Sequence, residues 1–433
     1  MVPHPKKPTM VPVQNPQDLD YMKRKSTISI IFFTVFLDLL GFGLVLPLLP
    51  NYASDPMFHA STMEIGVLMG IYSLMQFLFA PLWGRLSDHI GRRPVLIIGL
   101  FGSALSYLIY GLAESLMVLI LSRALAGFMG ANIAAAQAAM ADLTPPEKRA
   151  QAMGIIGAAF SLGFVLGPAM GGYLASTYGI SAAPLAAALI TGLNAVAALF
   201  LLSETRDLST EQQQPLSKRA HPLSLHPWKQ ARNYPGALMV CLFMGLFITL
   251  FAAFEMALPL WTQIIMGWDS GSQTMAENGH LFAFVGVVMA IVQGGIVRRL
   301  VPKIGEVRTA YSGLICIALG LMLLGQASNY TTLLIALGLA ATGAGLVHPA
   351  FSSLVSLNTD KDKQGLMMGL FQSMGALGRV LGPLWAGIAF VSLKGNLFFV
   401  SAMGMTVLLG ALIPLSRDRI KDARQIAAQD AKS

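Results

Sequence analysis

Twelve long apolar runs constrain this chain more than any other feature of its sequence. A helix needs about 20 apolar residues to cross a bilayer, and each run is close to or above that length. Only 12% of the residues are charged, whereas soluble proteins have roughly a quarter. We therefore predict an all-α polytopic membrane protein with twelve transmembrane helices. The runs lie at 27–50, 62–84, 94–113, 117–141, 151–175, 181–202, 235–265, 279–300, 308–326, 331–356, 365–392 and 396–416.

Positive charge is distributed unevenly among the connections between these runs. Of the 29 lysines and arginines, 26 fall on the two ends of the chain and on alternate connections. The opposite connections hold Lys394, while Arg123 and Arg379 lie inside runs. Cytoplasmic loops are enriched in Lys and Arg, so we predict that both termini are cytoplasmic. We therefore attribute the net charge of +8 to membrane topology rather than to binding of nucleic acid, and we expect no nucleic-acid partner.

The runs divide six and six around a polar linker, and the two sets repeat in sequence. GFVLGPAMGG at 163–172 recurs as GRVLGPLWAG at 378–387, an offset of 215 that also relates Gly130 to Gly345. Such repeats build transporters with a site near the bilayer midplane. We predict two pseudo-symmetric six-helix halves. The expected division is a cytoplasmic arm 1–26, a first half 27–203, a linker 204–234, a second half 235–416 and a cytoplasmic tail 417–433.

The connection GRLSDHIGRRP, residues 84–94, places one acid among several basic residues. Its glycines permit a tight turn and a close approach of helix ends. Asp88 could bind the positive N-terminal end of the run at 365–392, near Gly365, and act as a gating latch. The alternative is a basic loop that only fixes topology. The latch residues would be Gly84, Asp88, Gly91, Arg92 and Arg93.

The segment GFVLGPAMGG contains glycines at every fourth position. Gly163, Gly167 and Gly171 therefore share one helix face and permit close helix packing. Pro168 removes a backbone donor and bends the helix. A kinked, tightly packed helix of this kind, which also carries Gly172, can act as a hinge and seal a cavity against proton leak. Packing alone is the other interpretation.

Ionisable side chains inside a membrane are costly and mark candidate functional sites. Asp38 lies about ten residues, or roughly 15 Å, from the inner end of its run. Arg123 lies about seven residues, or roughly 10 Å, from the outer end of its own. These depths are compatible with an ion pair or a water-bridged contact. Burial favours the neutral acid and a nearby arginine favours the carboxylate, so Asp38 could exchange a proton. A static pair that joins two helices is the alternative.

The second half holds weaker candidates for a substrate cavity. Glu255 and Arg379 are expected toward the outer side, where they could pair, bind substrate or line a cavity mouth. Glu255 could equally be solvated at the interface. His348 could relay protons or contact a ligand, although a packing role is as acceptable. Four further polar residues could contact substrate or form interhelical hydrogen bonds: Asn132, Gln137, Gln293 and Gln372.

Several of these motifs resemble those of the major facilitator superfamily. GRLSDHIGRRP is similar to its signature between the second and third helices, and SRALAGFMGA, residues 122–131, to its motif with an intramembrane arginine. GFVLGPAMGG resembles the motif of its antiporters. LDLLGFGLVLPLLP, residues 37–50, is similar to the first helix of the twelve-helix drug–proton antiporters, especially the tetracycline-efflux branch. That branch carries an acid in its ninth helix, whereas residues 312–326 have none, so the substrate is not carried over.

The expected function is proton-coupled export of a small amphiphilic compound, such as a drug, by alternating access. Asp38 and Arg123 would couple the proton, and the resemblance places the protein in a bacterial inner (plasma) membrane. We expect a monomer driven by the proton gradient, with no metal, no other cofactor and no enzymatic activity, because nucleotide and metal motifs are absent from the sequence. The alternatives are an exporter or importer of an endogenous metabolite or siderophore and, more remotely, a non-transporting scaffold or receptor.

Overall fold

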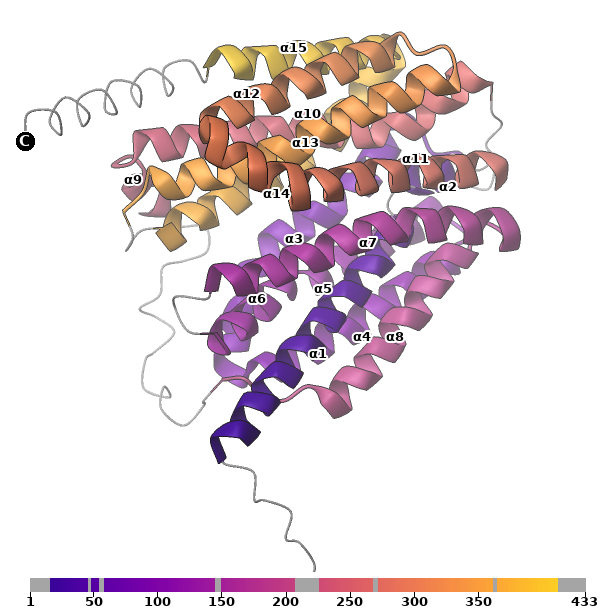
Figure 1. Ribbon diagram of the computed structural model, residues 1–433. Coiled ribbons are helices and arrows are strands. Elements are labelled where there is room, and N and C mark those ends of the chain that lie inside the picture. Colours follow the sequence, from indigo (N-terminus) through magenta and orange to yellow (C-terminus); the bar gives the residue numbers. More distant parts are fainter. Residues whose placement is uncertain are drawn as a thin grey trace, which may run out of the picture.

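The structure is a computed structural model, and it describes residues 16–45, 48–53, 58–144, 149–206, 226–267, 272–360 and 364–411. All the regular elements in these ranges are helices, arranged in two groups (Figure 1). The helices are α1 (Pro16–Val45), α2 (Leu49–Ala53), α3 (Thr62–Ile90), α4 (Arg92–Gly111), α5 (Leu116–Gly130), α6 (Ile133–Asp142), α7 (Arg149–Tyr178), α8 (Ala182–Leu201), α9 (His226–Ala231), α10 (Pro235–Met266), α11 (Ser272–Ile291), the π-helix η4 (Val292–Ile296), α12 (Val297–Gly325), α13 (Tyr330–Leu357), α14 (Gln364–Leu393) and α15 (Asn396–Ala411).

Each of the twelve predicted runs coincides with helix, but several are interrupted. The first run is divided between α1 and α2, and the fourth is broken into α5 and α6 by a turn at Ala131 and Asn132. Gly305 separates the eighth and ninth runs inside α12 with φ 81°, a conformation that glycine tolerates best. Helix α1 begins at Pro16, so part of the predicted arm is helical. The predicted tail and residues 1–15 lie outside the described ranges.

Nine stretches of the described residues are long and apolar enough to cross a membrane. One of them, Thr274–Gly325, has 52 residues and contains α11, η4 and α12. That length exceeds the roughly 20 residues of a single crossing. Helix α15 is apolar but shorter. The total of twelve crossings therefore stays a prediction.

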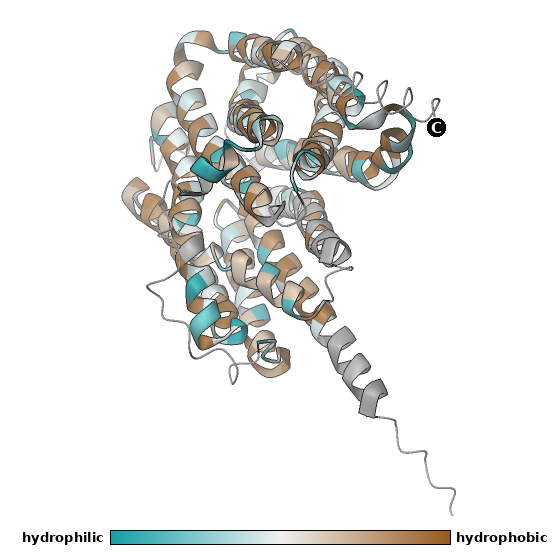
Figure 2. Ribbon diagram, turned by 90° about the vertical axis from the view of Figure 1, so that its left-hand side faces the viewer, coloured by the Kyte–Doolittle hydropathy of each residue, from teal (hydrophilic) through white to brown (hydrophobic). Residues whose placement is uncertain are grey.

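Apolar side chains cover the outside of the helices as well as the interior. Phe200, Met403 and Val407 are among the exposed large apolar residues, at 77%, 67% and 66% of their accessible surface. Figure 2 shows apolar stretches along the helices of both halves, with more polar stretches between them. A bilayer solvates such a surface, whereas water does not. Together with the apolar spans, this surface identifies an integral membrane protein.

Helices that begin between apolar spans satisfy their first N–H groups locally. Ser61 and Glu64 form a capping box at the start of α3, in which Glu64 N–H donates to Ser61 Oγ over 3.3 Å and Ser61 N–H donates to Glu64 Oε2 over 2.8 Å. Asn329 accepts from Thr332 N–H over 2.9 Å and caps α13. Backbone groups cannot be left unpaired in a bilayer, so these polar residues fix where the helices begin.

The two halves touch closely at one end and separate at the other. At the contacting end, a Cβ added to Gly66 of α3 would lie 2.5 Å from the carbonyl oxygen of Pro383 in α14. Further along the same antiparallel pair of helices, a Cβ at Gly84 or Gly369 would meet nothing within 4 Å. In Figure 1 the halves converge at the end that holds α2 and diverge toward α6 and α9. The gap therefore opens toward the predicted cytoplasmic side.

The glycines predicted to pack α7 lie against α1, as expected from their spacing. A Cβ at Gly167 would be 2.6 Å from the backbone of Gly43, and one at Gly163 would be 3.0 Å from Leu39. Gly171 lies against the backbone of Leu44. In the other half, Gly378 of α14 lies against Gly245 of α10 in the same manner. The sequence repeat is thus a repeat of helix packing.

Gly167→Ala is expected to lower the melting temperature of the purified protein in detergent. The added methyl group has no room against Gly43, and such overpacking costs about 1–3 kcal/mol. Gly192→Ala in α8 is the matched control, since its Cβ would meet Ala104 at an ordinary 3.8 Å. It should be neutral or stabilising, because alanine favours helix over glycine. Equal melting temperatures for the two variants would contradict this packing.

Candidate functional site

Arg123 is enclosed by aromatic rings rather than paired with an acid. Its side chain on α5 is 1% exposed. The guanidinium carbon lies 4.7 Å from the ring centroid of Tyr72 and 5.8 Å from that of Phe42. Within the described residues, none of its three nitrogens has a hydrogen-bond partner. Cation–π attraction is strongest when the cation is desolvated, so the rings supply the stabilisation that an acid would otherwise give.

Asp38 belongs to the same cluster without forming an ion pair with Arg123. The carboxyl group is half-buried, and no hydrogen bond or ion pair joins it to the other described residues. Tyr72 lies within electrostatic reach of both Asp38 and Arg123, and so does Tyr107. The structure thus brings the two predicted residues together but forms no direct pair. The water-bridged contact stays a prediction.

A second charged group lies in the other half, around Arg379. This arginine is within electrostatic reach of Glu255 of α10 and of Tyr72 of the first half. His348 is also within reach of Arg379, and its ring lies 5.7 Å from that of Phe371. Arg379 is fifteen residues after Gln364 and fourteen before Leu393, at the middle of α14 rather than toward the outer side. Glu255 lies nearer the C-terminal end of α10, and its position on the outer side stays a prediction.

The four predicted polar contacts occupy different environments. Asn132 is buried, and its amide lies against Gly99 of α4, which favours a packing role. Gln137 on α6 and Gln372 on α14 are exposed, and Gln293 in η4 is half-buried. Only Gln372 shares a helix with the charged group of the second half.

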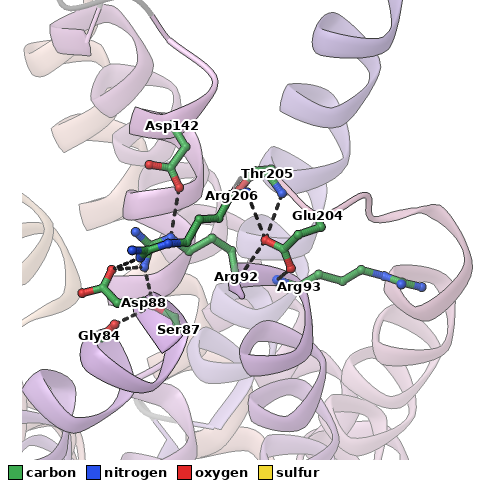
Figure 3. Close-up of polar contacts among 9 residues, drawn as sticks. All are labelled: Gly84, Ser87, Asp88, Arg92, Arg93, Asp142, Glu204, Thr205 and Arg206. Atoms are coloured by element: carbon green, nitrogen blue, oxygen red, sulfur yellow. Dashed lines mark hydrogen bonds and ion pairs between the residues drawn. The ribbon is translucent and has the colours of Figure 1, made fainter. Parts of the chain in front are cut away.

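The GRLSDHIGRRP segment forms a network of ion pairs with neighbouring helix ends (Figure 3). Asp88 accepts from Arg92 Nη1 over 2.7 Å and from Arg206 Nη1 over 2.6 Å. Arg92 Nε also donates to Asp142, at the end of α6, over 3.0 Å. Three helix ends and the segment after α8 are therefore joined by alternating charges. The predicted contact of Asp88 with the start of α14 falls at Gly365, whose surroundings lie outside the described side chains.

Glu204 anchors the same network and was not among the predicted residues. Its carboxylate accepts from the backbone N–H groups of Arg92 and Arg93 over 2.9 and 3.1 Å. It thereby caps the positive N-terminal end of α4. Gly91 has φ 101°, and a Cβ there would collide with this carboxylate. The predicted glycine is thus required both for its backbone angle and for the approach of Glu204.

Unlike the other glycines of its motif, Gly172 faces the second half. A Cβ at Gly172 would lie 2.9 Å from Gly279 of α11. Pro168 also contributes to this interface, because its carbonyl oxygen would be 2.6 Å from a Cβ at Gly279. Helix α7 therefore packs against α1 with one face and against the second half with another. This contact lies at the end where the two halves meet.

Metal binding receives no support from the part of the chain that the structure describes. No group of three or more histidine, cysteine, aspartate or glutamate side chains could hold an ion there. The arrangement instead places acids and arginines of the two helical halves around Tyr72. Such groups can bind protons and a small charged molecule.

Comparison with known sequences identifies a family of transporters. Residues 31–383 match the Major Facilitator Superfamily. Tetracycline resistance protein, class C, of Escherichia coli is 33% identical over 386 residues, covering 86% of this chain and 94% of that protein. Human major facilitator superfamily domain-containing protein 10 is 29% identical over 435 residues, covering 89% and 91%.

Solved structures agree with this assignment. The human organic anion transporter MFSD10 (TETRAN) aligns with a TM-score of 0.66 at 27% identity, covering 92% of this chain and 100% of that one. The nucleoside transporter NupG aligns with a TM-score of 0.69 at 15% identity, covering 90% and 98%. The latter likeness concerns the fold alone.

Glu204→Ala is expected to speed amide hydrogen exchange in the first turn of α4. The substitution removes the acceptor for the N–H groups of Arg92 and Arg93, and a lost cap costs about 1 kcal/mol. Glu204→Gln keeps one acceptor oxygen and should show a smaller change. Exchange mass spectrometry on a peptide that begins several residues before Gly91, and so retains the amides of Arg92 and Arg93, measures both. An unchanged rate in Glu204→Ala would contradict the capping role.

Proposed function

We propose that this chain, which belongs to the major facilitator superfamily, exports a small amphiphilic compound in exchange for protons. Transport of a small molecule across a membrane, rather than enzymatic catalysis, is the activity of this family and of its solved relatives. The observation that carries the finer proposal is the position of Asp38. This unpaired acid is half-buried inside a membrane protein whose two halves pack closely at one end and diverge at the other.

Asp38 would couple protons to movement of the two halves. While the gap is open, water can reach the acid and stabilise its charged form. Closing the gap removes that water, and an isolated carboxylate is costly in a dry site. Closure would therefore favour the protonated acid. Arg123, held by its aromatic rings, would limit this effect by its positive charge.

The network around Asp88 would control the predicted cytoplasmic end. In the open arrangement Asp88 binds Arg92 and Arg206. When the halves close at this end, the start of α14 would approach the same carboxylate, and its N–H groups would attract a negative charge. The network would then act as the latch of the outward-facing state. Both termini and the linker are proposed to lie on this side of a bacterial inner membrane.

Export of a drug is favoured by the relatives named for tetracycline resistance. The relative named as an organic anion transporter admits a different substrate, including an endogenous metabolite or siderophore. An importer on the same fold would move its substrate in the opposite direction. A non-transporting scaffold or receptor would show no flux. We propose a monomer with no cofactor other than the proton gradient and no nucleic-acid partner.

Asp38→Asn is expected to abolish proton-driven flux in proteoliposomes with an imposed pH gradient, because an amide cannot exchange a proton. A panel of amphiphilic substrates, tetracycline included, would be assayed for uptake and release. Glu114→Gln, an exposed acid in a connection, is the matched control and should transport normally. Flux that ignores the gradient in the unaltered protein would overturn antiport. Coupled flux that survives in Asp38→Asn would remove this residue from the proton path.

Asp88→Asn is expected to reduce transport severalfold while leaving membrane insertion and folding intact. The amide keeps the shape of the side chain but loses the charge that pairs with Arg92 and Arg206. Partly exposed ion pairs contribute little to stability, so the effect should appear in transport rate. Asp360→Asn, an exposed acid that accepts from Tyr234, is the control. Undiminished transport in Asp88→Asn would argue against the latch.

A further inference from the structure

Arg379 is a cation in the middle of a membrane protein that remains accessible to solvent. It lies at the centre of α14, where a charged side chain is expensive unless it is paired or reaches water. Its side chain is nevertheless exposed. No salt bridge or hydrogen bond joins it to the other residues that the structure describes. The guanidinium is therefore available to a partner from outside the chain.

The contrast with Arg123 distinguishes the roles of the two arginines. Arg123 is 1% exposed and covered by the rings of Tyr72 and Phe42, so a ligand cannot reach it without moving them. Arg379 has no such cover. Tyr72 lies within electrostatic reach of both, which places Arg379 opposite the aromatic cluster of the first half. A molecule bound at Arg379 would thus lie between the halves.

The side of α14 that carries Arg379 presents a second polar side chain, Gln372. Gln372 is seven residues earlier, two helical turns away on the same face, and is also exposed. Gly375 lies between them, and a Cβ there would meet only Arg379 Nη1, at 3.8 Å. The guanidinium therefore folds back over a glycine toward an exposed amide. Guanidinium and amide N–H groups together donate to carboxylate or sulfonate oxygens.

Among the described residues, no acid is in direct contact with Arg379. Glu255 is within electrostatic reach but forms no ion pair at 4 Å or less with any described residue. His348 is also near and can donate a hydrogen bond in either protonation state. An arginine with no acid in contact can donate charge-assisted hydrogen bonds to a negative group of a bound molecule.

We propose that Arg379, with Gln372, binds an anionic group of the transported compound, and that the aromatic rings around Tyr72 contact its apolar part. The substrate class is therefore an amphiphilic organic anion with a carboxylate, sulfonate or enolate. This inference rests on the proposed transport function. It adds a specificity-determining site in the second half to the proton site of the first half.

Matched dyes of opposite charge test the proposal by equilibrium binding to the purified full chain in detergent. Fluorescein, an anion at mildly alkaline pH, and tetramethylrhodamine methyl ester, a cation, share one xanthene framework. Fluorescence polarisation should show that Arg379→Gln weakens fluorescein binding by tenfold or more, as expected for a lost charge-assisted hydrogen bond. Binding of the cationic dye should be unchanged or tighter.

Further variants separate recognition from folding. Arg379→Lys keeps the positive charge and should retain part of the fluorescein affinity. Glu255→Gln removes the neighbouring negative charge and should tighten fluorescein binding. Arg298→Gln, at an exposed position of α12, is the matched control and should bind as the unaltered protein does. Melting temperatures confirm that each variant is folded.

Three outcomes would overturn the proposal. They are an unaltered protein that does not bind fluorescein, unchanged fluorescein affinity in Arg379→Gln, and equal loss of both dyes in that variant. Because binding is measured without a gradient, the result is independent of proton coupling. Arg379-dependent binding together with gradient-independent flux would support the anion site and overturn only the antiport mechanism.

Discussion

The low polarity of the bilayer is the constraint on which the rest of this structure depends. It requires every backbone group to be paired within a helix or its cap, and it makes each internal charge costly. The chain meets the first requirement with helices that begin at capping residues such as Ser61 and Asn329. It answers the second by keeping few ionisable groups inside and by giving each a particular environment. These environments differ enough to assign different roles.

The internal charges form two groups, one in each half, and Tyr72 lies within electrostatic reach of both. In the first half, Arg123 is sealed by aromatic rings and Asp38 is left unpaired and partly accessible. In the second, Arg379 is accessible, with Glu255 near it but not in contact. A solvent-accessible acid and a solvent-accessible arginine can both exchange one binding partner for another. A sealed arginine cannot, so Arg123 acts as a fixed charge.

The sequence predicted the features that depend on residues close together in the chain. It missed the contacts between residues that only the fold brings together. Apolar length placed the helices, and glycine spacing predicted close packing of α7, although not its partner α1. Nothing local distinguishes Tyr72 or Phe42 from ordinary membrane aromatics, so the enclosure of Arg123 was not foreseen. Glu204 appeared to be one more polar residue after the sixth run, because only the folded chain brings it to the start of α4. The end at which the halves meet depends on contacts between distant helices, such as Gly66 with Pro383, which no local pattern indicates.

The two-sided packing of α7 has a mechanical consequence. Its glycines bring the backbone of α1 almost into contact, while Gly172 holds the second half at Gly279. At Gly167 and Gly172 backbone meets backbone, so no side chain there can absorb a displacement. A shift of α1 near Asp38 would therefore be passed to α7 and from α7 to α11, which would alter the spacing between the halves. The contact between the halves is in this way linked to the position of a helix that carries an internal acid.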